Sequence, residues 1–503
     1  MRLLNKYGLI LSILLVYVVT AYNSTGYYHP DEHYQIIEFA GLKSGWNKGD
    51  DLTWEYDARI RPALQPMIAS VCFYLLEKAG IGSPFDKTLF LRLLTAGLVL
   101  CSIYCFARIM QREVKPLNRK LFWGLSFFLW FLPAVNVRFS SETWAGLCLI
   151  LAIAWSCKQG TRSLRACAGT GLLMGLSFEF RFQMAFCIIG LLLWLLLVRK
   201  WNIKQLSLLI VAGFSVVVGG IALDSWFYGE PVVAFYNYFE SNILQDMASN
   251  FGISPWYYYF IQVTESATTL LGLAIWISLL VFLLYFRYHI LSWCLIPFLI
   301  VHFLVPHKEL RFLFPLINLV PFLLVMGFQL LTDYLTSPFI RKALINPVFG
   351  VIVLVNILGL VIMMNKPAGN GNVGMAAYID DKYGYENINL YAYPNNSPYS
   401  VGTYKGLTAR FYLNGRVRIL DFSKSEIRNQ CNHPAYAEDK DLVVLPANDE
   451  FARAMVERWQ FKEERRSMPA WVSFMNRFYK IYDDRRILVL YTKKNNLDRQ
   501  TVD

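Results

Sequence analysis

The sequence predicts a polytopic α-helical membrane protein followed by a small α/β domain outside the bilayer. Two observations favour this class. Of the 503 residues, 55% are hydrophobic and only 17% are charged, which is too apolar for a soluble globular protein of this length. Apolar runs long enough to cross a hydrocarbon core of about 30 Å recur along residues 1–365. We therefore assign residues 1–365 to a transmembrane domain.

About eleven of these runs are expected to cross the membrane. They begin near Tyr7, Leu89, Leu121, Ser141, Ala166, Phe182, Leu206, Ala267, His289, Arg311 and Pro347. The first run resembles a signal peptide, but no small-residue cleavage site follows it and many further spans do. We expect it to be a retained transmembrane helix.

The apolar run 62–76 is ambiguous, and the distribution of basic residues decides it. If this run does not cross, the N-terminus and alternate loops place sixteen Lys and Arg on one side, against four in the short loops opposite. Cytoplasmic loops are enriched in Lys and Arg. We therefore expect a cytoplasmic N-terminus, and one long external loop, 24–88, that contains an interfacial or re-entrant helix.

The polar tail, residues 366–503, falls on the external side and is expected to fold as a separate α/β domain. Four short segments have the composition of buried strands: Asn387–Tyr393, Val417–Phe422, Leu442–Leu445 and Ile487–Tyr491. Asp449–Trp459 has helical spacing after an Asn/Asp start. The tail thus combines strand and helix patterns.

Charged side chains far apart in the sequence are expected together on the external face. Ionisable groups are costly to hold at a membrane, so such clusters are candidate functional sites. The first cluster follows the first span directly, and another lies in the turn that precedes the tenth. The candidate site residues are His29, Asp31, Glu32, Glu55, Arg61, Arg181, His307, Lys308, Glu309 and Arg311.

This mixture of charges suits transfer of a group from a phosphate ester to an alcohol. A carboxylate can act as general base toward a hydroxyl, while Lys, Arg and His can bind a phosphate and stabilise its developing charge. Phosphate-binding loops of the usual glycine-rich kinds are absent from the sequence. No disulfide framework or zinc spacing is present, and we expect no metal and no cofactor. The net charge of +12 is explained by the membrane rather than by nucleic acid.

Each cluster also has a simpler structural interpretation. Asp31 and Glu32 could merely complement a helix dipole after Pro30. The charged turn 307–311 could reach the interface without binding anything. Arg61 could be a headgroup anchor, and Asp224 and Arg181 could form structural ion pairs.

At these residues the chain resembles the family-22 glycosyltransferases, multi-pass mannosyltransferases of the GT-C class. The matching segments appear in family order across nearly the whole membrane portion. They are His29-Pro30-Asp31-Glu32 with Gln35, Leu52-Thr53-Trp54-Glu55 with Arg61 and Pro66, Arg92-Leu93-Leu94, Asp224-Ser225-x-Phe227-Tyr228-Gly229, Pro255-Trp256-Tyr257, and His307-Lys308-Glu309-x-Arg311-Phe312. The tail from Lys366 onward has no matching motif.

The resemblance implies an inverting transfer of mannose from polyprenyl- or dolichyl-phosphate mannose to a glycolipid or glycan. Asp31 would be the catalytic base, with Glu32 as second choice. His307, Lys308 and Arg311 would contact the donor phosphate, and Arg61 would partner the active-site loop. The membrane would be a bacterial inner membrane with a periplasmic site, or the endoplasmic reticulum with a luminal site.

Three other functions stay open. A GT-C enzyme could use another polyprenyl-linked sugar, such as arabinose or glucose. A transporter or flippase of lipid-linked sugar would also have many spans, but its charges should lie near the midplane, often in repeated halves. A receptor-like binding protein is supported only by the external tail.

Overall fold

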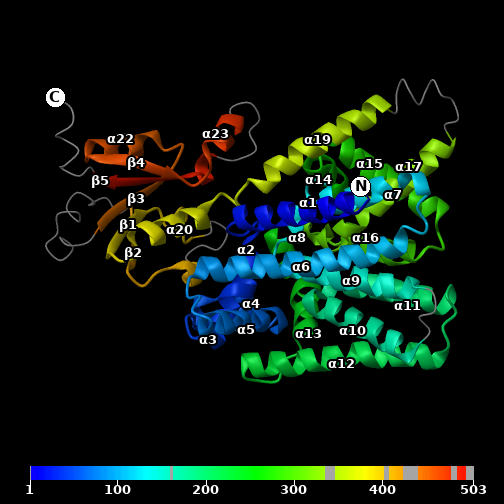
Figure 1. The fold of residues 1–503 in the computed structure, drawn as a ribbon. Coiled ribbons are helices and arrows are strands. Elements are labelled where there is room, and N and C mark those ends of the chain that lie inside the picture. The colour runs from blue at the N-terminus through cyan, green and yellow to red at the C-terminus, as the bar shows by residue number, and fades with distance from the viewer. Residues whose placement is uncertain are drawn as a thin grey trace. The chain divides into compact units, whose positions relative to one another are not determined.

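The chain forms two compact units in a computed structural model that describes residues 2–158, 163–334, 346–400, 407–422, 440–476 and 484–493. The first, here called the helical unit, comprises Met1–Tyr22, Ala58–Ile68 and Phe90–Asn365. The second, the mixed unit, comprises Asn23–Asp57, Ala69–Leu89 and Lys366–Asp503. Figure 1 labels their elements.

The helical unit consists of helices in the described residues. Its longer helices are α1 (Arg2–Asn23), α6 (Pro84–Met110), α7 (Arg119–Phe128), α9 (Ser141–Cys157), α10 (Leu164–Phe180), α11 (Ala185–Leu197), α12 (Ile203–Tyr228), α15 (Thr269–Tyr285), α16 (Ile290–Leu304), α17 (Val320–Tyr334) and α19 (Asn346–Met364). Shorter elements are α8 (Leu132–Asn136), α13 (Ala234–Phe239), α14 (Tyr258–Ser266) and the 3₁₀-helix η7 (Leu310–Leu319). Helix α5 (Leu64–Lys78) has residues in both units.

Several of these helices are long and apolar enough to cross a membrane. Four described segments qualify singly, and α15 with α16, bent by 119°, would make a fifth. The four are Pro84–Met110, Ile203–Tyr228, Leu310–Tyr334 and Pro347–Met364. Three shorter apolar helices, Tyr7–Asn23, Ser141–Cys157 and Phe182–Leu197, accompany them. The prediction of a helical, multi-span membrane protein is therefore confirmed, while the count of eleven spans stays a prediction.

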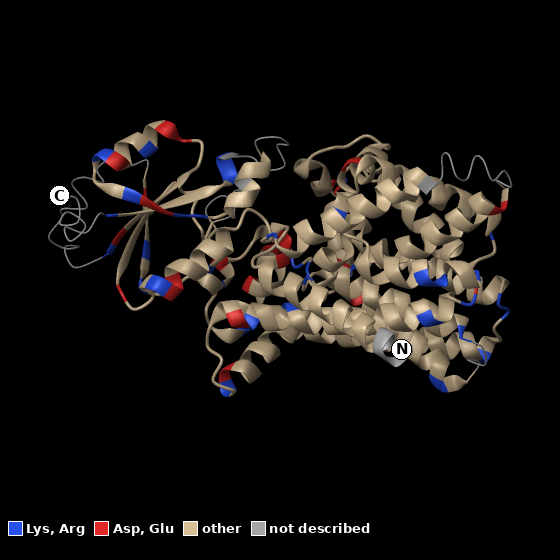
Figure 2. Cartoon of the chain, turned by 45° about the horizontal axis from the view of Figure 1, so that its top comes forward, with Lys and Arg blue, Asp and Glu red and all other residues tan. Residues whose placement is uncertain are grey.

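Charge is sparse along the helical unit. In Figure 2 its helices are almost uncharged along their lengths, and Lys and Arg gather in loops at one end of the bundle. Small residues let two of its helices approach closely: a Cβ on Gly171 of α10 would lie 2.1 Å from the Leu209 carbonyl oxygen of α12. Close backbone approach of this kind is typical of packing between membrane helices.

The mixed unit contains a five-stranded sheet in the order β2-β1-β3-β5-β4. Its strands are β1 (Ile388–Ala392), β2 (Val417–Asp421), β3 (Lys440–Pro446), β4 (Phe461–Arg466) and β5 (Leu488–Lys493). Strand β1 pairs in parallel with β2 and β3, while β5 pairs antiparallel with β3 and β4. Helix α22 (Glu450–Arg458) packs Ala452 and Val456 against the sheet.

The predicted α/β character of the tail is confirmed. All four predicted strands and the predicted helix are present, with ends shifted by one or a few residues. Strand β4, with the sequence FKEERR, was not predicted because it lies at the sheet edge and exposes charged side chains instead of a buried apolar run.

Residues 23–57 fold into short helices within the mixed unit. They are α2 (Pro30–His33), the π-helix η1 (Tyr34–Glu38), α3 (Phe39–Ser44), the 3₁₀-helix η2 (Gly49–Asp51) and α4 (Trp54–Asp57). From the tail come α20 (Asn372–Tyr383), α23 (Ala470–Asn476) and the 3₁₀-helices η9 (Arg410–Tyr412) and η11 (Asp484–Arg486). Residues 23–57 and the tail thus belong to one compact unit, and the domain boundary between 365 and 366 stays a prediction.

Candidate functional site

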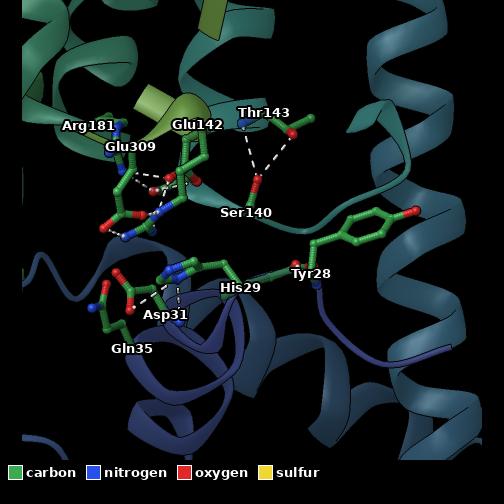
Figure 3. Close-up of polar contacts among 12 residues, drawn as sticks. Tyr28, His29, Asp31, Gln35, Ser140, Glu142, Thr143, Arg181 and Glu309 are labelled. Atoms are coloured by element: carbon green, nitrogen blue, oxygen red, sulfur yellow. Dashed lines mark hydrogen bonds and ion pairs between the residues drawn. The ribbon is translucent and has the colours of Figure 1, made fainter. Parts of the chain in front are cut away.

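Asp31 lies in the first turn of α2, next to its capping residue. Pro30 occupies the first helical position, where its missing N–H costs nothing. The His29 Nδ1 accepts the Asp31 backbone N–H at 3.3 Å and lies 3.3 Å from the Asp31 carboxylate. Figure 3 shows these two side chains turned toward each other. The Asp31 side chain is 12% exposed, so its carboxylate is shielded yet accessible.

The neighbouring acidic residues support this helix. The Glu32 carboxylate accepts the backbone N–H of Tyr28 at 3.1 Å, which is a capping interaction. Glu55, buried in α4, accepts a hydrogen bond from the Gln35 side chain at 2.9 Å. Gln35 lies four residues after Asp31, on the same helical face. Glu32 thus holds the backbone that precedes Asp31, and Glu55 holds the Gln35 side chain.

In the helical unit, two arginines share one carboxylate. Glu142 Oε1 lies 2.9 Å from Arg181 Nη1 and 3.4 Å from Arg311 Nη1. All three side chains are largely buried, with 6–13% exposure. The Phe312 ring lies 5.1 Å from the Arg181 guanidinium, within cation–π distance. Figure 3 shows Glu142 beside Arg181 and Glu309.

Local structure explains how these groups meet. Ser140 caps α9 by accepting the Thr143 N–H, so Glu142 lies in the first turn, where a carboxylate is favoured. One turn further on, a Cβ at Gly146 would lie 2.6 Å from the Pro315 carbonyl oxygen. Glycine therefore permits η7 to lie against α9, which brings Arg311, at the start of η7, to Glu142.

The turn before η7 extends this network. Glu309 accepts hydrogen bonds from Arg311 Nε at 2.5 Å and from Arg311 Nη2 at 3.2 Å. His307 places Nε2 3.0 Å from Glu309 and Nδ1 3.0 Å from the Gly252 carbonyl oxygen. Both partners are acceptors, which favours the imidazolium. The hydrogen bond to Glu309 accordingly raises the pKa of His307.

Lys308 is held by backbone carbonyls. Its Nζ donates to Ser254 O at 3.1 Å and to Val305 O at 2.5 Å. The side chain is buried, and burial lowers the pKa of its ammonium. One N–H group thus holds Ser254 and a second holds Val305, the residue that follows α16.

Arg61 follows a segment held by the end of α12. The Tyr228 hydroxyl donates to the Arg61 carbonyl oxygen at 2.8 Å, and the Asp224 carboxylate accepts the Ala63 N–H at 2.7 Å. The Arg61 guanidinium lies 5.9 Å from the centre of the Tyr238 ring. The Asp224 carboxylate thus binds a backbone N–H, whereas Arg181 forms an ion pair with Glu142.

The structure therefore brings nine of the ten candidate residues into two groups, one in each unit, and the tenth, Arg61, belongs to the helical unit. Arg181, His307, Lys308, Glu309 and Arg311 cluster in the helical unit, and His29, Asp31, Glu32 and Glu55 surround α2 in the mixed unit.

Glu142 is a site residue that the sequence did not predict, although Ser140-Ser141-Glu142 is typical of the start of a helix. Among the described residues no three His, Cys, Asp or Glu side chains come together as metal ligands.

Comparisons with known proteins identify relatives. Residues 9–378 match the model of the Alg9-like mannosyltransferase family. GPI mannosyltransferase 3 of Yarrowia lipolytica is 26% identical over 367 residues, covering 70% of this chain and 66% of that protein. GPI alpha-1,2-mannosyltransferase 3 of Bos taurus is 26% identical over 334 residues, covering 64% and 58%. The chain thus aligns with somewhat less than two thirds of these relatives' lengths.

The fold is also known from solved structures. ArnT from Cupriavidus metallidurans bound to undecaprenyl phosphate superposes with a TM-score of 0.57 at 14% identity, covering 97% of this chain and 98% of that one. Its apo form gives a TM-score of 0.51. This likeness establishes a GT-C type fold. With the family match extending over most of the sequence, the chain belongs to the Alg9-like mannosyltransferase family.

Proposed function

We infer that this protein is an inverting mannosyltransferase that moves mannose from a polyprenyl-phosphate donor to a glycolipid or glycan on the non-cytoplasmic membrane face. The observation that carries the proposal is the family match over residues 9–378, because that stretch contains every charged group described above. The relatives named as GPI mannosyltransferases and the fold shared with a protein bound to undecaprenyl phosphate support the same donor class.

Asp31 is assigned as the base. Its carboxylate takes the proton of the acceptor hydroxyl as that oxygen attacks the anomeric carbon of mannose, and the bond from that carbon to the phosphate oxygen breaks. The electron pair of that bond leaves with polyprenyl phosphate. Because the hydroxyl attacks in one step from the face opposite the phosphate, the configuration inverts. Asp31 suits this role better than Glu32, because the Glu32 carboxylate caps the Tyr28 N–H.

The cations of the helical unit are assigned to the phosphate. A phosphodiester donor carries one negative charge, and the departing phosphate gains a second. Guanidinium groups fixed in place before the reaction stabilise this increase without reorganisation. Arg181 and Arg311 are held by Glu142, Glu309 and Phe312, and they therefore meet this requirement.

The proposal includes a topology of about eleven spans, with a cytoplasmic N-terminus and with residues 24–88 and 366–503 outside. A single cysteine placed within 110–120 of a cysteine-free protein should resist an impermeant thiol reagent added from outside. One placed within 395–400 should react. The opposite pattern would overturn the topology.

Activity is tested with purified protein, polyprenyl-phosphate mannose and a lipid extract, with mass spectrometry of the glycolipid products. A hexose added to one lipid class, absent with Asp31→Asn, is the expected result. Parallel reactions with polyprenyl-phosphate glucose and arabinose test the alternative donor sugars. Sugar lipid that crosses vesicles without transfer would instead indicate a flippase.

A further inference from the structure

A buried histidine–glutamate pair lies directly behind Asp31. His33 Nε2 is 2.7 Å from Glu38 Oε1, and both side chains are 1% exposed. Glu38 also accepts hydrogen bonds from Asn47 Nδ2 at 2.5 Å and from the Phe411 backbone N–H at 3.1 Å. A buried carboxylate is tolerated when donors surround it, and three nitrogen atoms surround this one.

Aromatic rings enclose the imidazole. Tyr27 and Tyr412 both stack on it, each with its ring centre 5.0 Å from that of His33 and with interplanar angles of 19° and 15°. Tyr34 and Phe411 meet its edge. The ring is therefore fixed in position and in tilt.

The pair depends on the π-helix η1. His33 is the last residue of α2, two positions after Asp31, and Glu38 is the last residue of η1. Residues five apart point roughly 140° apart around an α-helix, whereas the i→i+5 pattern of a π-helix brings them onto one side. The contact between His33 and Glu38 therefore fixes the wider turn.

Half of this enclosure comes from the tail, more than 370 residues away in the sequence. Besides the Phe411 N–H and the Tyr412 ring, the Leu407 carbonyl oxygen accepts the Tyr34 hydroxyl at 3.4 Å. The Phe411 ring stacks on Phe73, with centres 4.9 Å apart. This tail segment is thus anchored in the aromatic core of the mixed unit.

We propose that His33, Glu38 and Tyr412 are positioning residues, through which the C-terminal tail sets the orientation of the helix carrying Asp31. The proposal rests on the proposed function, because it takes Asp31 as the base. It gives the tail a role in the chemical step, separate from any role in acceptor choice.

The direction in which the Asp31 side chain points depends on the π-helical turn η1. If the π-turn relaxed to α-helical geometry, α2 would shift by one residue relative to α3, a rotation of about 100°. The Asp31 carboxylate would then point in a different direction relative to α3. Misplacement of a reacting group by about 1 Å already costs up to about 100-fold in rate, so loss of the pair should lower kcat while leaving the donor contacts of the helical unit unchanged.

The test compares two tyrosines buried in the same unit. Tyr412→Leu removes a stacking ring from His33, and Tyr491→Leu removes a ring from the sheet core. For Tyr412→Leu we expect kcat to fall about 10- to 100-fold with little change in donor KM, and Tyr412→Phe should recover most of that loss. Tyr491→Leu should lower the unfolding temperature but not kcat per folded molecule. Equal kcat losses in the two leucine variants would overturn the proposal.

Hydrogen exchange provides a readout that does not need turnover. Tyr412→Leu should accelerate amide exchange in residues 30–38 more than Tyr491→Leu does. Equal exchange in that segment would overturn the coupling, whatever the activity. If the wild-type protein transferred no sugar but exchange changed selectively, the proposed function would fail and the coupling would hold.

Discussion

The two charged groups of this protein are held by different means. In the helical unit, Arg181 and Arg311 are fixed by other charges, chiefly the carboxylates of Glu142 and Glu309. In the mixed unit, the Asp31 helix is fixed by its backbone, through the His29 cap and the π-turn behind it. Carboxylates can orient arginines that are as buried as these, because a buried guanidinium needs a charged, hydrogen-bonded partner.

A general base is positioned by what surrounds its helix. Rings packed against a neighbouring residue fix the place of a carboxylate without lowering its proton affinity, as a bound cation would. The aromatic rings around His33, two residues after Asp31, can act in this way. The comparison predicts that substitutions near Asp31 lower mainly the rate of the chemical step. Substitutions of Arg181, Arg311 or their partners should raise mainly the donor KM.

The largest effect is expected for Asp31→Asn, which keeps the size of the side chain and removes the base. General-base catalysis contributes about 10²- to 10⁴-fold, so transfer by reconstituted protein should fall by about 1000-fold. Glu32→Gln is the matched control, and its loss should be much smaller because an amide oxygen can still accept the Tyr28 N–H. If Glu32→Gln lowered the transfer rate more than Asp31→Asn does, Glu32 and not Asp31 would be the base.

The second effect concerns Arg311→Ala. Hydrogen bonds to charged groups contribute about 1.5–3 kcal/mol, so donor KM should rise about 10- to 100-fold while acceptor KM changes little. Arg59→Ala provides the control: its ion pair with Glu230 is about half exposed, and such pairs contribute little. If Arg311→Ala left the donor KM unchanged, Arg311 would have no role in phosphate binding.

Gly146→Ala tests whether the fold of the cluster matters as well as its charges. The added methyl group would meet the Pro315 carbonyl oxygen, and overpacking of this kind costs about 1–3 kcal/mol. The displaced η7 would carry Arg311 away from Glu142. We expect donor KM to rise about tenfold, whereas Gly124→Ala, in open space on α7, should behave as wild type. Equal donor KM values in the two variants would contradict this account.

The smallest effect is a pH dependence from His307. Its pKa is raised by Glu309, so protonated His307 stabilises the folded state fully below its ordinary pKa of about 6.5. This contribution is lost as pH rises through the raised value. The unfolding temperature of wild type should therefore exceed that of His307→Gln by more at pH 6 than at pH 9. If wild type and His307→Gln differed in unfolding temperature by the same amount at both pH values, this contribution would be excluded.

Much of the architecture could be predicted because its signals are local. Apolar runs identified the helices of the membrane portion, and short apolar segments identified four strands. Strand β4 could not be predicted, because a strand at the edge of a sheet can expose charged side chains and needs no apolar run. The candidate residues His29, Asp31 and Arg311 could be located because charge next to a membrane span is costly. The pairing of Arg181 with Glu142 could not be predicted, because the two residues belong to different helices and spacing along one helix does not specify which helices meet.

The sequence by itself determined the class of the protein, its family and the residue types available for chemistry, because hydropathy, charge and motif order are properties of the chain. Only the tertiary structure decided which charges meet. The contact of Gly146 with Pro315 brings Arg311 to Glu142, and the π-turn brings Glu38 to His33, with the tail completing the enclosure. Such pairings depend on close approach and backbone register, which periodicity along one segment does not encode.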